Sequence, residues 1–331
     1  GAALPHVRDV LVEAGTIAAL DPPPERAAGA ATIDLGGHLL LPGFVNAHYH
    51  SHDVLAKGRF DTMPLEHWGI VAGAIGSGRS VEEVRLRTLT GAVECLRNGV
   101  TTVQDFANLN PLDDALVDAV VDAYAAAGLR VVLSLAVRDL PQIDTLPWGR
   151  EVVPRALHDV VGDSRGDAER QLAFVERQID RVGDRGGVVV WALSASAPQR
   201  CSPALLERLA ALAERRDLPV YTHVYETRAQ RVHAARAYRD HGGSLVAMMD
   251  AVGLLGPRTT IAHGVWPDDA EIERLAATGT GVVLNMLSNL RLRSGVAPIA
   301  AYRRRGVPLA LGCDNCSCSD VQSMFQVMKL Y

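Results

Sequence analysis

The strongest constraint on the fold is a regular alternation of helix-like and strand-like segments along most of the chain. Helical periodicity is expected over 81–97, 112–127, 167–181, 202–216, 244–252, 268–277 and 297–305. Apolar runs typical of buried strands follow these segments, over 101–105, 130–137, 188–194, 218–223, 259–263, 281–285 and 307–314. With an extended segment from Phe44, the pattern gives eight strands that alternate with helices. It predicts a closed parallel (β/α)8 barrel of the TIM type, an α/β fold.

The N-terminal region follows a different pattern. Short β-like pieces, VLVEA, TIAAL and ATIDL, are separated by Gly15 and by a Pro/Ala-rich loop. We therefore expect residues 1–40 to form part of a small flanking β-sheet domain and residues 41–331 to form the barrel.

Composition limits the classes of function. A length of 331 residues with 48% hydrophobic content suits one large α/β domain. The net charge is -5, and no basic block indicates a nucleic-acid surface. No apolar run reaches the roughly 18 residues of a membrane-spanning helix. The odd count of five cysteines argues against a disulfide framework. We expect a cytoplasmic protein with no membrane or nucleic-acid partner.

Candidate metal ligands stand where apolar runs end. In LLLPGFVNAHYH, His48 and His50 are alternate residues and would project to one side of a strand. His223 closes LPVYTH, His263 closes TTIAH and Asp314 closes VPLALGCD. Because the carboxyl ends of barrel strands meet at one mouth, these side chains are predicted to converge there and to bind metal.

These motifs carry a family resemblance. PGFVNAHYH, THVYET, IAHGVW and LGCDN resemble the amidohydrolase superfamily, in the branch of cytosine, guanine and S-adenosylhomocysteine deaminases and s-triazine hydrolases. The resemblance implies a divalent metal bound by His48, His50, His223 and Asp314, with a position left for water. Two-metal members carry a bridging carboxylate on strand 4, whereas 187–200 contains no Lys, Asp or Glu. We therefore expect one ion, with zinc the first choice and iron the alternative.

The resemblance also implies catalytic roles. Glu226 would carry a proton to the substrate ring nitrogen, and His263 would contact the attacking hydroxide or polarise the substrate. Asp314 would take the proton of water and pass it to the leaving group. Gln104 at the end of a strand and Trp68 in a loop are candidate substrate contacts, although Trp68 could equally be loop packing.

The expected reaction is hydrolytic deamination of an amino-substituted nitrogen heterocycle, with the small heterocycle and water as the reactants. An s-triazine chlorohydrolase or N-alkylaminohydrolase is the alternative, and a non-catalytic metal-binding relative is a lesser one. In the resembled family, the small β domain is completed by an earlier strand and by a long segment after the barrel, so we expect it to be incomplete here. We also expect a homodimer.

Overall fold

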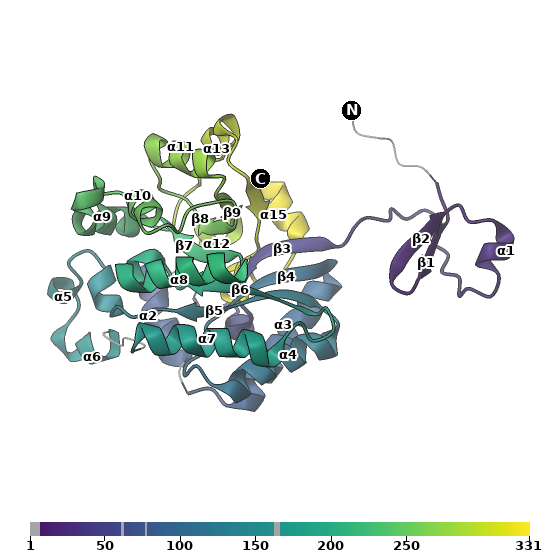
Figure 1. Cartoon of the computed structure of the whole chain (residues 1–331), viewed down its shortest axis with the longest axis horizontal. Coiled ribbons are helices and arrows are strands. Elements are labelled where there is room, and N and C mark those ends of the chain that lie inside the picture. The colour runs from purple at the N-terminus through teal and green to yellow at the C-terminus, as the bar shows by residue number, and fades with distance from the viewer. Residues whose placement is uncertain (1–6, 61–62, 77, 162–165) are drawn as a thin grey trace. The chain divides into compact units, whose positions relative to one another are not determined.

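The chain divides into two compact units, Gly1–Pro42 and Gly43–Tyr331 (Figure 1). The computed structural model describes residues 7–60, 63–76, 78–161 and 166–331. The division lies two residues beyond the predicted domain boundary.

The N-terminal unit contains one β-hairpin. Strands β1 (Val10–Glu13) and β2 (Thr16–Leu20) pair antiparallel, and helix α1 (Pro24–Ala27) follows. Ala14 and Gly15 join the strands with φ values of 49° and 77°. Positive φ at both positions is the requirement of a two-residue hairpin turn. The strand-like reading of ATIDL was wrong: 31–35 forms no strand, and Ile33 is 80% exposed because no neighbouring strand pairs with the segment.

The second unit is built around eight parallel strands, which confirms the predicted TIM-type barrel. Their spatial order follows the chain, from β3 to β10. The backbone N–H of Asp314 donates to the carbonyl of His48 at 2.9 Å and so brings the two ends of this order together. The strands are β3 (Phe44–Tyr49), β4 (Val100–Ala107), β5 (Arg130–Val137), β6 (Val189–Ala195), β7 (Val220–Val224), β8 (Thr259–His263), β9 (Gly281–Leu284) and β10 (Leu309–Leu311).

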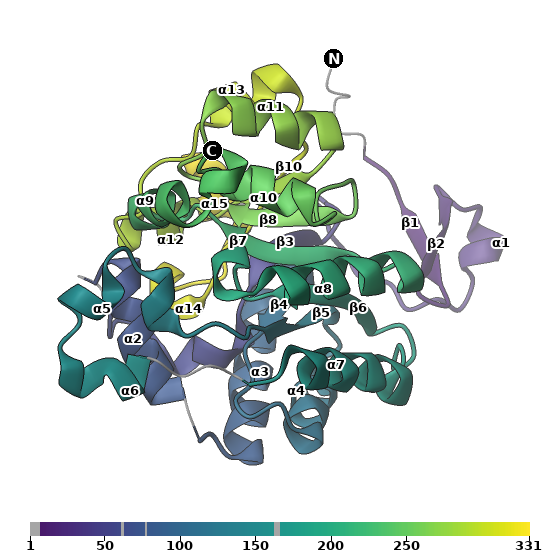
Figure 2. The ribbon, with the colours of Figure 1, turned by 60° about the vertical axis from the view of Figure 1, so that its left-hand side comes forward.

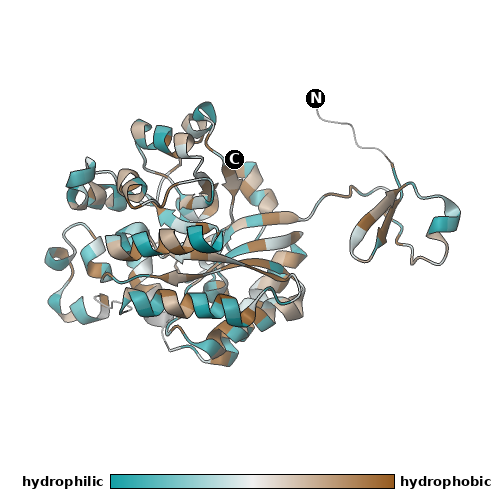
Figure 3. Ribbon diagram, viewed as in Figure 1, coloured by the Kyte–Doolittle hydropathy of each residue, from teal (hydrophilic) through white to brown (hydrophobic). Residues whose placement is uncertain are grey.

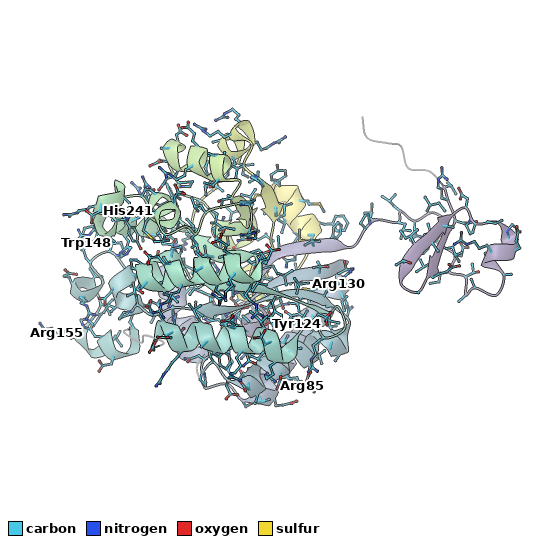
Figure 4. The ribbon with its side chains drawn as sticks, in the orientation of Figure 1. Arg85, Tyr124, Arg130, Trp148, Arg155 and His241 are labelled. Carbon is cyan, nitrogen blue, oxygen red and sulfur yellow. The ribbon has the colours of Figure 1, made fainter. Side chains whose placement is uncertain are left out.

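Helices surround the sheet (Figures 1 and 2). The seven predicted from periodicity are present, with ends within two residues of the prediction: α3 (Val81–Arg97), α4 (Asp114–Ala127), α7 (Ala168–Val182), α8 (Pro203–Arg216), α10 (Leu245–Ala251), α11 (Asp269–Thr278) and α13 (Ile299–Arg305). Six of them begin at a Ser or Asp whose side chain accepts a backbone N–H of the first turn. Apolar residues follow the strands, whereas polar residues colour the outer helices (Figure 3). Tyr124, labelled in Figure 4, reaches inward from α4 and donates to Asp105 on β4 at 2.8 Å.

Other elements connect these strands and helices or follow β10, and they lie outside the predicted helical ranges. They are α2 (Leu65–Gly76), α5 (Gly149–Val152), α6 (His158–Val161), α9 (Arg228–Ala237), α12 (Met286–Arg291), α14 (Cys316–Ser319), α15 (Met324–Leu330) and the 3-10 turns η1 (Ser51–Ala56), η2 (Gln142–Thr145), η3 (Arg155–Leu157), η4 (Pro198–Arg200) and η5 (Arg239–His241). Several of them shape the mouth of the barrel. No described helix is both long enough and apolar enough to cross a membrane.

Candidate metal centre and active site

The structure brings the four histidines and the aspartate of the predicted site together at the carboxyl ends of the strands. His48 and His50 lie at the end of β3, and their Nε2 atoms are 3.5 and 3.4 Å from Asp314 Oδ1. His223 Nε2 lies 3.3 Å from His50 Nε2. Two groups of potential ligand atoms, each spanning at most 4.8 Å, share His48: His48 with His50 and His223, and His48 with His263 and Asp314. Because His48 belongs to both groups, the five residues form one cluster.

Backbone carbonyls orient two of the imidazoles. His50 Nδ1 lies 2.9 Å from the carbonyl of Phe106, and His223 Nδ1 lies 2.7 Å from the carbonyl of Ser196. A carbonyl can only accept, so each Nδ1 carries the proton and each Nε2 presents a lone pair. His48 Nε2 is buried without a hydrogen-bond partner. A divalent cation would satisfy these lone pairs, and imidazoles with one carboxylate suit zinc. The residues therefore fit the metal that the family implies.

Three non-glycine residues of this mouth have positive backbone φ. Tyr225, His263 and Asp314 have φ values of 50°, 74° and 62°. This left-handed region is costly for residues with a side chain, and such strain persists only where surrounding contacts enforce it. These backbone bends lie at or just after the ends of the strands, and they turn the side chains of His263 and Asp314 toward the cluster.

Glu226 and His263 form the acid–base part of the site. His263 Nε2 lies 3.5 Å from Glu226 Oε2, and both residues are buried. Burial, followed by the nearby Asp314 and Glu66 carboxylates, raises the pKa of Glu226 well above its usual value. Burial lowers the pKa of His263, against the attraction of Asp314. Both shifts favour the proton on Glu226 rather than on His263.

Asn289 is a site residue that the sequence reasoning did not identify as such. Its Oδ1 lies 2.9 Å from His263 Nδ1, so that nitrogen carries a proton and Nε2 faces Glu226 as an acceptor. The polar Ser288-Asn289 pair in α12, the helix that follows β9, was the available signal.

Asp314 remains ionised at the centre of the cluster. Burial would raise its pKa, but the neighbouring His48, His263 and His50 together hold the pKa below its usual value. Burial lowers the pKa of His48 to about 3, so this imidazole is neutral at physiological pH. A carboxylate among neutral imidazoles is the charge state required of metal ligands.

The cluster opens into a pocket. The volume within which the centre of a water molecule can move there is about 160 Å³. One water needs roughly 10–15 Å³ by this measure, so the space accommodates a bicyclic ring. Trp68 lines the pocket, and its Nε1 is buried without a partner. Gln104 instead lies below the pocket wall, where its Nε2 donates to Ser134 Oγ at 3.1 Å and its side chain adjoins His48. His52 also lines the pocket.

The cysteines do not join the metal cluster. Cys201 Sγ contacts the carbonyl of Val137 at 3.5 Å, and neither group of potential ligands among the described residues contains a cysteine. All five cysteines are free and buried. Burial raises the pKa of the Cys201 thiol. With no acidic side chain between 187 and 200, β6 offers no carboxylate to bridge two ions.

A parallel (β/α)8 barrel with a buried histidine–aspartate cluster at one mouth defines a class of barrel hydrolases. The chain belongs to the Amidohydrolase family, whose model matches residues 39–331. It is 34% identical over 327 residues to the 5'-deoxyadenosine deaminase of Methanothermobacter thermautotrophicus, covering 97% of this chain and 68% of that protein. It is 33% identical to a 5-methylthioadenosine/S-adenosylhomocysteine deaminase of Nitratidesulfovibrio vulgaris, covering 91% and 61%. The resemblance predicted from the motifs is confirmed.

A solved structure resembles most of this chain. The adenosine deaminase of Xanthomonas campestris with bound zinc superposes with a TM-score of 0.70 at 27% identity, over 86% of this chain and 58% of that one. The chain thus spans about 58% to 68% of the length of these three proteins.

Proposed function

We propose that this protein is a metal-dependent aminohydrolase that removes ammonia from an amino-substituted nitrogen heterocycle. The observation that carries the proposal is the pairing, beside the histidine cluster, of two buried carboxyl groups whose pKa values are shifted in opposite directions. Burial raises the pKa of Glu226, whereas the neighbouring histidines hold the pKa of Asp314 below its usual value. Deamination needs both an acid for the ring nitrogen and a base for the attacking water.

Each residue then has a defined task. Glu226 donates its proton to the ring nitrogen next to the reacting carbon. His263 accepts a hydrogen bond at Nε2 and orients the attacking water. Asp314 takes the proton of that water and delivers it to the departing amine. When bound by His48, His50, His223 and Asp314, a divalent cation supplies Lewis-acid chemistry that makes water acidic near neutral pH.

The substrate class is supported by the pocket and by the relatives. The pocket accommodates a bicyclic ring, and the buried, unpaired Nε1 of Trp68 offers it a donor. The two relatives reported above are deaminases of adenosine-derived compounds, which favours a purine. Zinc is the proposed cation because the adenosine deaminase neighbour contains it. The five free cysteines support the cytoplasm as the proposed location.

The test measures ammonia and chloride in parallel. Zinc-loaded protein is incubated with aminopurines, adenosine derivatives, aminopyrimidines, aminopterins and chloro-s-triazines. We expect ammonia from at least one purine and none from the Asp314→Asn variant. Glu207→Gln, a matched carboxylate change at an exposed position of α8, should leave turnover unchanged. Chloride without ammonia would replace the proposal by a chlorohydrolase, and no product from metal-loaded protein would indicate a non-catalytic relative.

A further inference from the structure

The pocket wall next to β6 contains an arginine, Arg200, that has no role in the proposed reaction. Arg200 lines the pocket at the end of η4. Among the residues that the structure describes, no carboxylate forms an ion pair with it. Its Nε is buried and has no hydrogen-bond partner, and the same holds for Oε1 of the adjacent Gln199. A buried, charged donor without an acceptor is costly unless a ligand supplies one.

The position of Arg200 is fixed. Its carbonyl accepts the backbone N–H groups of Asp139 and Leu140 at 3.3 and 3.1 Å. The Asp139 carboxylate itself binds Ser202, whose backbone N–H and hydroxyl it accepts at 2.7 and 2.6 Å. The backbone of Arg200 is therefore held in place, and the Asp139 carboxylate is engaged with Ser202, the N-cap residue of α8.

Two neutral side chains, those of Gln142 and Ser196, orient the Arg200 guanidinium, and some of its N–H donors remain without an acceptor. Nη2 donates to Gln142 Oε1 at 3.1 Å, and Nη1 donates to Ser196 Oγ at 3.4 Å. A guanidinium has five N–H donors in a rigid planar fork. Gln142 and Ser196 both line the pocket, so the guanidinium is held by two residues of the pocket wall. Neutral partners hold the fork in place without neutralising its charge.

Ser196 links this fork to the reacting end of the pocket. Its carbonyl holds His223 Nδ1 at 2.7 Å, while its hydroxyl accepts from Arg200. A ring placed against Glu226 and His223 would therefore direct a substituent or its far edge toward Arg200. Ser196 contacts both His223 and Arg200 and so fixes the spacing between them.

We propose that Arg200, oriented by Gln142 and Ser196, is a specificity-determining residue that binds an oxygen acceptor with full or partial negative charge on the substrate. The oxygen is a carboxylate on a side chain or an exocyclic oxygen on the ring. This inference rests on the proposed deaminase function and adds the substrate class to it. Arg200 takes no part in proton transfer.

The experiment compares two pairs of compounds that differ in such an oxygen. S-adenosylhomocysteine carries a carboxylate that 5'-methylthioadenosine lacks, and guanine carries an exocyclic oxygen that 2-aminopurine lacks. Affinities are measured by calorimetry on metal-stripped protein, and kcat/KM is measured on zinc-loaded protein. Arg200→Met should weaken binding of the oxygen-bearing member of one pair about 10- to 100-fold and leave the affinity of the partner without that oxygen within about twofold. The pair that responds identifies the source of the oxygen.

Two further variants keep the result interpretable. Arg200→Lys retains the charge but not the fork and should lose part of the effect. Arg208→Met removes an exposed arginine of α8 that pairs with Glu169 at 3.5 Å, and should change nothing. Equal losses for both members of a pair, or no loss for any oxygen-bearing compound, would overturn the proposal. If wild-type protein discriminates in calorimetry but hydrolyses none of the compounds, the proposed function fails while the role of Arg200 stands.

Discussion

At the scale of single residues, His223 and Glu226 are close in sequence but have different proposed roles. Glu226→Gln should keep the metal and lower kcat by at least ~100-fold, the usual scale of general acid–base catalysis. His223→Ala should lose metal, because its Nε2 faces the cluster. Elemental analysis and steady-state kinetics on both variants check this. A Glu226 variant that releases metal beside a His223 variant that retains it would reverse the assignments.

Asp53 is a residue for which the structure predicts pH-dependent stability. Burial raises its pKa to about 6, although the Ser317 hydroxyl donates to it. The folded protein therefore holds a proton that the unfolded chain releases near pH 4. Below pH 4 the shifted pKa of Asp53 does not lower the free energy of unfolding. Between pH 4 and pH 6 the loss of stability grows, and above pH 6 it stays at about 3 kcal/mol.

Asp53→Asn should remove this cost. The free energy of unfolding of the metal-stripped variant, relative to wild type, should rise by up to about 3 kcal/mol between pH 4 and pH 7. Urea titrations at both pH values measure it. A difference that is constant with pH would show that Asp53 titrates normally.

At the scale of elements, Tyr225 joins β7 to α9 and α11 between His223 and Glu226. Its hydroxyl donates to Glu271 at 2.7 Å and accepts from Arg231 at 3.0 Å and from the Leu245 N–H at 2.8 Å. Tyr225→Phe leaves these partners unsatisfied, so we expect about 1–3 kcal/mol less stability and a lower kcat with metal retained. Tyr221→Phe, in the preceding strand β7, is the control and should affect neither quantity. Unchanged turnover would limit Tyr225 to a structural role.

The junction of β10 with β3 and β9 depends on Gly312. A Cβ there would lie 2.4 Å from Asn285 Oδ1 and 2.9 Å from His48 Cβ. Gly312→Ala should therefore displace His48, weaken metal binding and destabilise the fold by about 1–3 kcal/mol. Gly281→Ala on β9 would meet nothing closer than 3.4 Å and should be tolerated. Metal titrations of the two variants test this, and equal affinities would show that the junction yields.

At the scale of the whole molecule, metal binding should be coupled to stability because ligands come from β3, β7 and the segment after β10. One equivalent of divalent cation per chain is expected. At 100 times its Kd the cation should raise the free energy of unfolding by about 2.7 kcal/mol. Chelation followed by thermal unfolding and elemental analysis measures both quantities. Two equivalents per chain, or a Tm unaffected by chelator, would contradict the single coupled site.

The sequence by itself determined the eight-strand barrel and the set of residues at its mouth. Local periodicity carries this information, because a buried parallel strand and an amphipathic helix each impose a repeat on neighbouring residues. The ends of α3 and the positions of His48, His50, His223, His263 and Asp314 followed from it. Each predicted ligand stood where a strand ended, and strands of a barrel end at a common mouth.

The tertiary structure alone decided what depends on contacts between distant segments. The unpaired donor of Arg200, the contact of Asn289 with His263 and the raised pKa of Glu226 each arise from residues far apart in the chain. ATIDL has a strand-like sequence, but no neighbouring strand pairs with it. Burial and hydrogen-bond satisfaction are properties of the packed molecule, so local sequence patterns could name these residues but could not assign their charge or their partners.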